Sequence, residues 1–268
     1  MKLLILQIKI AFTISLVSLG LTTVQAQPNK SVILVQSPTS RSSQQLNKPL
    51  IFNTPLPPDD IGAPGHRTAG GKRGCENIDK QFTNVKKKSL TALVPIYGSK
   101  NSGLVFGLIT TSNPSFWFYV PYSSKINAEF ALQDIRGNIV YQTPVLLSGT
   151  PGIVNISLAS TAVSLEIGQQ YHWYFNIYCQ PEQPPISIDG WIQRNSVNSV
   201  QKTLLEKATP QQRLTIYASN GYWYDALTIA SGLRRNDPKN TDWTTLLQAI
   251  GLADIAPEPI VNCCHSEN

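Results

Sequence analysis

Apolar and polar positions alternate most clearly in the stretch 171–179, YHWYFNIYC. Its odd-numbered positions are apolar or aromatic as far as Cys179, and its even-numbered positions are polar or carry a polar aromatic group. Because successive side chains of a strand point to opposite faces, one face of this segment is expected in a dry core and the other against a second layer or a ligand. The pattern predicts a central β-strand.

Short strand-like runs separated by turn residues precede and follow this segment. Leu165, Gly168 and Tyr171 have the spacing of a tyrosine corner, the turn into strand F of fibronectin-type and immunoglobulin-like sandwiches. Eight runs without an intervening helical pattern predict an antiparallel sandwich over residues 65–196. The predicted strands are 90–95, 103–110, 115–122, 128–134, 139–147, 152–158, 171–179 and 187–194.

The period becomes helical near residue 197. Thr209 and Gln212 form a capping box with Pro210 at the first helical position, and Gly221 ends that helix. Two further apolar periodic stretches follow, and Thr241 or Asp242 caps the last one. The expected fold is therefore mainly β: an antiparallel immunoglobulin/fibronectin-like sandwich followed by a helical cap of three to four helices over 197–262.

The N-terminus has the pattern of a secretory signal peptide over residues 1–26. Lys2 precedes an apolar run, and Val24-Gln25-Ala26 ends it with small residues at the cleavage positions. An uncleaved anchor helix is the alternative, since the run is near the length that spans a bilayer. Residues 27–64, rich in Ser, Gln and Pro, predict a disordered linker. The mature protein is expected in the periplasm, the cell envelope or the extracellular space, with no membrane span.

The distribution of charge argues against a nucleic-acid site. The net charge is +6 at pH 7, and both lysines of the predicted signal contribute to it. The run Lys86–Lys88 is interpreted as a solvated loop, because no aromatic residues interleave with it. The glycine-rich stretch 62–75, with Arg67, Lys72 and Arg73, is expected to be a tight structural loop, with an anion-binding nest as the alternative.

The four cysteines, at positions 75, 179, 263 and 264, are an even number in a chain expected to be exported. This favours disulfides over free thiols. Adjacent Cys263 and Cys264 rarely bridge each other, so a Cys75–Cys179 bridge is expected. A metal site at Cys263, Cys264 and His265 is the rival interpretation, but contiguous ligands lack the usual zinc spacing, and no metal or other cofactor is expected.

Five aromatic residues are the candidate binding residues. If the strands 115–122, 171–179 and 187–194 lie side by side, these aromatics share one outer sheet face, which is too much apolar surface to leave bare. Either the C-terminal helices cover the face, or part of it stays open as a platform for sugar rings or a partner protein. The five residues are Trp117, Tyr119, Tyr174, Tyr178 and Trp191.

No catalytic motif is present, since the sequence contains neither G-x-S-x-G nor H-E-x-x-H. The expected function is a non-enzymatic binding or envelope-interaction module whose partner is an unknown protein or glycan. The alternative is a carbohydrate-active hydrolase that uses a carboxylate pair drawn from Glu129, Asp134 and Asp189. Only their separation in space could support that alternative.

Six motifs recur in order along the chain: LTALVP at 90–95, FWFYVPY at 116–122, GTPGI at 149–153, YHWYF at 171–175, GWIQR at 190–194 and YWYDAL at 222–227. With these motifs the chain, from about Gly62 to Cys264, resembles an exported cyanobacterial family catalogued as domain of unknown function 928. The resemblance implies an extracytoplasmic protein of a cyanobacterium, and it brings no assigned reaction.

Overall fold

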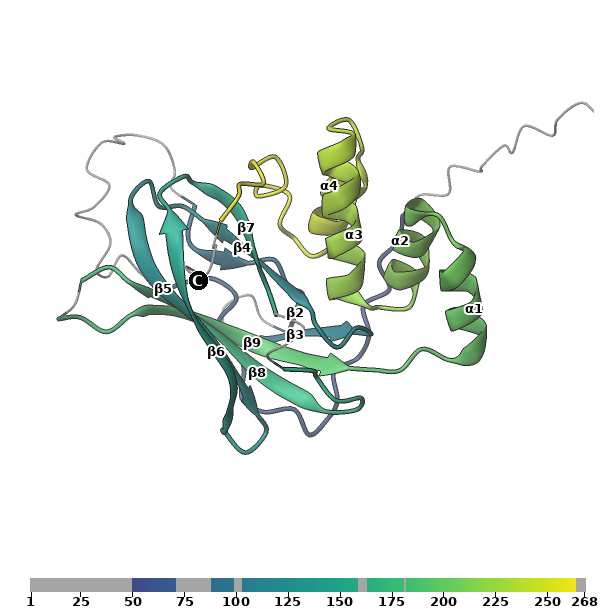
Figure 1. Cartoon of the computed structure of the whole chain (residues 1–268), viewed down its shortest axis with the longest axis horizontal. Coiled ribbons are helices and arrows are strands. Elements are labelled where there is room, and N and C mark those ends of the chain that lie inside the picture. The colour runs from purple at the N-terminus through teal and green to yellow at the C-terminus, as the bar shows by residue number, and fades with distance from the viewer. Residues whose placement is uncertain (1–49, 71–87, 99–102, 159–162, 181, 264–268) are drawn as a thin grey trace, which may run out of the picture. The chain divides into compact units, whose positions relative to one another are not determined.

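A computed structural model describes residues 50–70, 88–98, 103–158, 163–180 and 182–263, which form nine strands in two sheets and four helices (Figure 1). The smaller sheet has the order β1 (Thr91–Ala92), β4 (Ser115–Val120), β7 (Gly152–Ser157). The larger sheet has the order β2 (Ile96–Tyr97), β3 (Leu104–Ile109), β9 (Ile186–Arg194), β8 (Gln170–Tyr178), β5 (Lys125–Asp134), β6 (Ile139–Ser148).

The strand pairing is antiparallel, as predicted, at every pair but one. β3 and β9 run parallel, with Phe106 opposite Trp191. Strand β8 lies between β5 and β9, so the prediction of a central strand at 171–179 is confirmed. Its odd-numbered side chains are buried, and Trp173 and Phe175 have no exposed surface.

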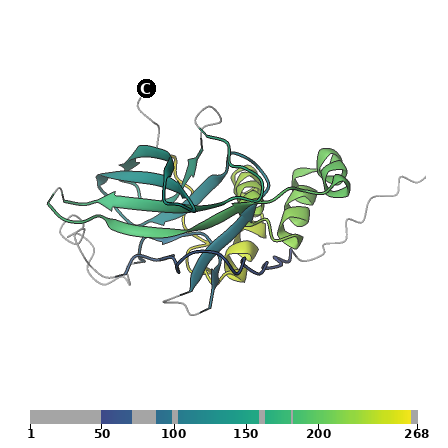
Figure 2. The same ribbon diagram turned by 90° about the horizontal axis from the view of Figure 1, so that it is seen from below.

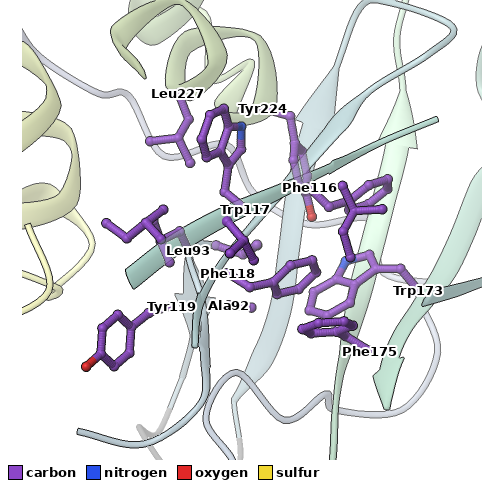
Figure 3. Packing of buried hydrophobic residues seen from close by; sticks show 14 of the residues in the cluster. Ala92, Leu93, Phe116, Trp117, Phe118, Tyr119, Trp173, Phe175, Tyr224 and Leu227 are labelled. Atoms are coloured by element: carbon purple, nitrogen blue, oxygen red, sulfur yellow. The ribbon is translucent and has the colours of Figure 1, made fainter. Parts of the chain in front are cut away.

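The core lies between the two sheets. Phe118 of β4 stacks on Phe175 of β8 with ring centroids 4.4 Å apart, and Phe116 meets Phe130 of β5 at 4.7 Å. Figure 3 shows Phe118 close to Trp173 and Phe175 on one side of β4, while Trp117 points to the other side. Such aromatic pairs contribute about 0.5–1.5 kcal/mol each beyond the burial of their area.

The placement of β4 corrects one prediction. Residues 115–122 were expected beside 171–179, but β4 belongs to the smaller sheet, and β5 takes the place next to β8. In the smaller sheet β4 is covered on both faces, by the larger sheet and by the C-terminal helices, which suits the continuous apolar run Phe116–Val120, whose five residues are all buried. A strand of this kind is covered on both faces, whereas β8 alternates.

Turn chemistry follows the sequence closely. Gly137 has φ 83° in the hairpin between β5 and β6, where a residue without a side-chain Cβ is favoured. Asp134 supports this turn by accepting hydrogen bonds from the backbone N–H groups of Arg136 and Asn138. Before β8, the hydroxyl oxygen of Tyr171 accepts a hydrogen bond of 3.0 Å from the backbone N–H of Glu166.

Four helices follow the last strand: α1 (Ser199–Lys207), α2 (Pro210–Ser219), α3 (Trp223–Asn236) and α4 (Asp242–Ala249). The capping box of Thr209 and Gln212 is confirmed, with Pro210 at the start of α2. Gly221 has φ 76° directly after that helix, which agrees with the predicted stop.

Helices α3 and α4 cover the outer face of β4. The ring of Trp117 meets the edge of Trp243 of α4 with centroids 5.9 Å apart, and its indole N–H donates to Thr228 Oγ1 of α3 at 3.2 Å. Trp223 of α3 donates its indole N–H to the Leu93 carbonyl oxygen at 2.7 Å. The first of the two interpretations, helices docked on aromatic side chains, therefore holds for β4.

Residues 50–70 form an N-terminal strap that contacts both the helices and the larger sheet (Figures 1 and 2). Phe52 packs edge-on against Trp223 of α3 at 4.8 Å, and Asn53 N–H donates to the Ala218 carbonyl of α2 at 3.0 Å. Farther along, Asp60 accepts from Gln170 at the start of β8. The predicted linker at 27–64 thus ends no later than residue 50, and its part before residue 50 lies outside the described residues.

Neither Cys179 nor Cys263 is a free thiol. Cys75 and Cys264 lie outside the described residues, so the Cys75–Cys179 pairing stays a prediction. Among the described residues, no helix combines the length and apolarity needed to cross a membrane.

Candidate binding surface

The outward face of β8 carries His172, Tyr174, Asn176 and Tyr178, none of which is fully buried. The backbone of α3 runs alongside β3 and β4, and none of the four helices runs alongside β5, β6, β8 or β9. We call the outward side chains of β5, β6, β8 and β9 the outer face. The sequence predicts five aromatic residues on one outer sheet face, and the structure places only some of them on the outer face.

The middle of the outer face is a ladder of hydrogen-bonding side chains that crosses four strands. Glu129 of β5 accepts from Gln142 of β6 at 2.8 Å and from Asn176 of β8 at 3.5 Å. Ser187 of β9 donates to the Asn176 side-chain oxygen at 2.7 Å. Burial, with the charge and hydrogen bond of Glu129, raises the pKa of the neighbouring Tyr178. The Tyr178 hydroxyl therefore stays protonated near neutral pH.

A second network lies one register step away and joins the outer face to the strap. The Tyr174 hydroxyl is 2.8 Å from His172 Nδ1, and His172 Nε2 is 2.8 Å from Asp189 Oδ2. The other carboxylate oxygen of Asp189 accepts from the backbone N–H of His66 at 3.0 Å and lies 2.8 Å from His66 Nδ1. Four polar side chains from three separate segments thus form one continuous chain.

The chemistry of this network fixes its donors and acceptors. Burial opposes ionisation of Asp189, but the hydrogen bonds from His172 and His66 outweigh it and hold the pKa of Asp189 below its ordinary value. A carboxylate only accepts, so His172 donates from Nε2 and its Nδ1 accepts the proton of Tyr174. Burial and the charge of Asp189 raise the pKa of Tyr174. The network therefore orients a protonated tyrosine hydroxyl and does not generate a phenolate nucleophile.

The strap covers one end of the outer face, at Trp191. The indole N–H of Trp191 donates to the Ala63 carbonyl oxygen at 3.0 Å, and the ring stacks on His172 with centroids 4.3 Å apart. Gly62 lies so close that a Cβ on it would fall 2.2 Å from the Trp191 ring. Trp191 is consequently 7% exposed, and it is a support for the strap and not an open platform residue.

Two more of the predicted binding residues are displaced from the outer face altogether. Trp117 and Tyr119 lie on β4, in the other sheet, and they are 2% and 6% exposed. Burial, with the charges of Glu258 and Asp254, raises the pKa of Tyr119 to about 12. Tyr174 and Tyr178 alone of the five predicted aromatics remain on the open face.

The three candidate carboxylates are not neighbours by strand register. Asp134 is used by the hairpin turn at the end of β5. Glu129 and Asp189 share the outer face but are two strands and two residues apart by register, about 12 Å between Cα atoms. A glycoside hydrolase needs the carboxyl groups themselves about 5–9.5 Å apart, so side chains on these positions would have to lean toward each other to form such a pair.

The guanidinium of Arg67 is engaged in hydrogen bonds within the fold. It donates to the carbonyl oxygens of Ile250 at 2.9 Å and Val94 at 3.5 Å. Burial lowers its pKa, against the charge of Asp254. This agrees with a structural loop rather than an anion nest, and Lys72 and Arg73 lie outside the described residues. Within the described ranges, no group of three or more His, Cys, Asp or Glu side chains is arranged to hold a metal ion.

Together these features define a class: a two-sheet β domain with a helical cap over one sheet and a polar, aromatic face on the other. The chain belongs to the family described as Domain of Unknown Function (DUF928), whose model matches residues 68–260. No curated protein and no solved structure matches the chain.

Proposed function

We propose that the chain is an exported, non-enzymatic binding module whose outer face holds a hydroxyl-rich ligand such as a glycan. The observation that carries this proposal is the arrangement along β8, where the side chains of Tyr174 and Tyr178 flank Asn176. The two tyrosine positions are about 14 Å apart along the strand. This spacing suits an extended ligand with more than one ring.

The polar ladder between the tyrosines supplies both signs of hydrogen bond. Glu129 offers a carboxylate, and Gln142 and Asn176 offer amide groups. Carboxylate and amide groups held by cross-strand hydrogen bonds lose little side-chain entropy when a ligand binds. Tyr178 is 39% exposed, so its ring is available for stacking on an apolar ring face.

The strand order supports a closer description of the fold as immunoglobulin-like. β1, β4 and β7 occupy the positions of strands A, B and E, and β3, β9, β8, β5 and β6 those of A′, G, F, C and C′. The hydrogen bond from Glu166 N–H to the Tyr171 hydroxyl has the geometry of a tyrosine corner at the start of strand F.

Export is supported by the N-terminal sequence pattern and by the absence of a free thiol at Cys179 and Cys263. A binding module in the envelope or periplasm would meet glycans there. The proposed place of action and the proposed ligand are therefore consistent with each other.

A capture experiment tests the proposal. The mature chain, immobilised, is exposed to solubilised envelope polysaccharide, and bound sugar is measured for the native chain, for Tyr178→Ala and Glu129→Gln, and for Leu204→Ala on exposed α1 as the matched control. We expect both outer-face variants to lose at least about tenfold in binding and Leu204→Ala to bind like the native chain. Equal binding by all four chains would contradict the proposal. Capture of a protein in place of sugar would show a partner-binding module, and release of reducing sugar that Glu129→Gln abolishes would favour the hydrolase.

A further inference from the structure

A hollow lies where the end of β3 and the β3–β4 connection meet α2 and α3. It is a cleft of about 230 Å³, and it shares no residue with the outer face. Its walls combine apolar and polar groups, among them Ile109, Asn113, Tyr217, Asp225, Thr228 and Ile229.

Asp225 is the unusual group in this cleft. The residue is 6% exposed, and its carboxylate accepts from the Thr110 backbone N–H at 2.8 Å and from the Thr110 hydroxyl at 3.1 Å. No Lys, Arg or His side chain of the described residues forms an ion pair with it. A buried carboxylate with hydrogen bonds but no counter-charge is costly to ionise.

The groups that face Asp225 do not supply the missing charge. Tyr217 comes from α2 and Tyr222 from the turn before α3. For both, burial and then the charge of Asp225 raise the pKa, so both are neutral phenols. Arg213 of α2 acts on Tyr217 and makes no ion pair with Asp225. Among the described residues no side chain balances the charge of ionised Asp225, and the cleft gives a cation from solvent a path to it.

We propose that this cleft binds a small organic ammonium ligand, with its cationic head against Asp225 and its apolar part between Ile109 and Ile229. The volume fits, since a cavity of about 150 Å³ already accommodates a benzene ring. The donor set is wrong for a bare metal ion, which needs several oxygen ligands where this cleft offers one carboxylate. The apolar walls instead favour a ligand that carries carbon next to its charge.

The test uses the mature chain, without the predicted signal at residues 1–26. The probe is n-butylammonium, and 1-butanol is its uncharged match. Burial raises the pKa of Asp225 to about 7. The carboxyl is therefore mostly ionised at pH 8 and mostly protonated at pH 5. We expect butylammonium to raise the melting temperature at pH 8, to bind at least about tenfold more weakly at pH 5, and 1-butanol to have no comparable effect.

Two variants and one direct measurement make the test decisive. Asp225→Asn keeps the size of the side chain and removes its charge, and it should lose the pH 8 stabilisation. Thr111→Trp fills the cleft mouth, where Thr111 is exposed, and should also lose it while leaving Asp225 intact. If Asp225→Asn does not fold, carboxyl NMR titration of the native chain decides: bound butylammonium must lower the pKa of Asp225 by at least about one unit. An unchanged Asp225 titration, or equal stabilisation of the Thr111→Trp chain, would overturn the proposal.

Discussion

The two sheets each present an aromatic strand to the outside, but with opposite consequences. The outer face of β4 carries Trp117 and Tyr119, and α3 and α4 close over it. The outer face of β8 carries Tyr174 and Tyr178, and among the described residues only the strap reaches that side, at Trp191. Both strands carry outward-facing aromatic residues, but the side chains next to those aromatics differ between the two strands.

The side chains next to the aromatics decide whether the face is covered or stays open. On β4 no polar side chain separates the aromatics, so only an apolar layer satisfies the surface. On β8 His172 and Asn176 alternate with the tyrosines, and each is tied into a cross-strand network. A helix laid on β8 would bury these polar groups and would have to satisfy them again. The difference teaches that the polar residues beside an aromatic, more than the aromatic itself, distinguish a docking layer from an open face.

The largest predicted effect breaks the covered face. Trp117→Ala removes a buried indole that packs on Trp243 and donates to Thr228. We expect about 5 kcal/mol of lost stability, from the cavity and the lost hydrogen bond, with loosening of α3 and α4. Urea unfolding measures the loss, and amide hydrogen exchange locates it in the helices. A loss below about 1 kcal/mol would mean that the helices do not depend on β4.

The second effect is the pH dependence of the same covered side, through Asp225. Its pKa, raised by burial to about 7, lies above that of an unfolded aspartate, so the folded state binds the extra proton between the two values. The contribution of Asp225 to stability is therefore complete below about pH 4 and falls by up to about 4 kcal/mol as the pH rises to 7. Urea unfolding of the native chain and of Asp225→Asn between pH 4.5 and 7.5 isolates this contribution as the difference in slope. Parallel pH profiles would show that Asp225 titrates normally.

Much of this fold was predictable because the local signals agree with each other. The strand runs, the hairpin at Gly137 and the capping box at Thr209 each rest on neighbouring residues and are observed close to where they were expected. Assignment of strands to sheets was not predictable in the same way. Alternation has the same period in every strand, so it places a side chain on a face but does not say which strand lies beside which.

The candidate site was predictable only in part. Tyr174 and Tyr178 follow from the alternation of β8, and the outward parity of β9 could have added Ser187 and Asp189. The continuous apolar run at Phe116–Val120 could have removed Trp117, because such a run is typical of a strand covered on both faces. Nothing local to Asp189 points to His66, which lies 123 residues earlier in the chain. Contacts of that kind depend on the path of the strap.

The third prediction concerns the strap, where the open face meets its only cover among the described residues. Gly62→Ala places a Cβ within 2.2 Å of the Trp191 ring, so the strap has to lift or the indole has to turn. We expect about 1–3 kcal/mol of destabilisation and faster proteolysis within residues 50–65. Gly70→Ala is the matched control, because a Cβ there meets nothing within 4 Å. Equal protease resistance of the two variants would show that the position of the strap does not depend on the close fit of Gly62 to Trp191.

The fourth prediction tests the turn before β8, where the Tyr171 hydroxyl binds the Glu166 backbone N–H. Tyr171→Phe removes the hydroxyl that accepts from Glu166 N–H and leaves the ring in place. We expect about 1 kcal/mol of lost stability, since a partly buried hydrogen bond from the Glu166 backbone N–H is lost. Tyr174→Phe, on the opposite face of the same strand, is the comparison and should cost less, because Tyr174 is only half-buried whereas Tyr171 is buried. The denaturation midpoints of the two variants are compared. A larger loss of stability in Tyr174→Phe than in Tyr171→Phe would contradict the prediction.

The smallest effect on stability is predicted for the most exposed aromatic of the outer face. Tyr178 is 39% exposed, and Glu129 beside it keeps its hydrogen bonds from Gln142 and Asn176 when the ring is removed. Tyr178→Ala should therefore change the free energy of unfolding by no more than about 0.5 kcal/mol, as is usual for surface positions. A midpoint shift comparable to that of Tyr171→Phe would mean that a further layer covers β8 in the folded chain. In that case the contrast between the two aromatic strands would disappear, because both would serve as docking faces.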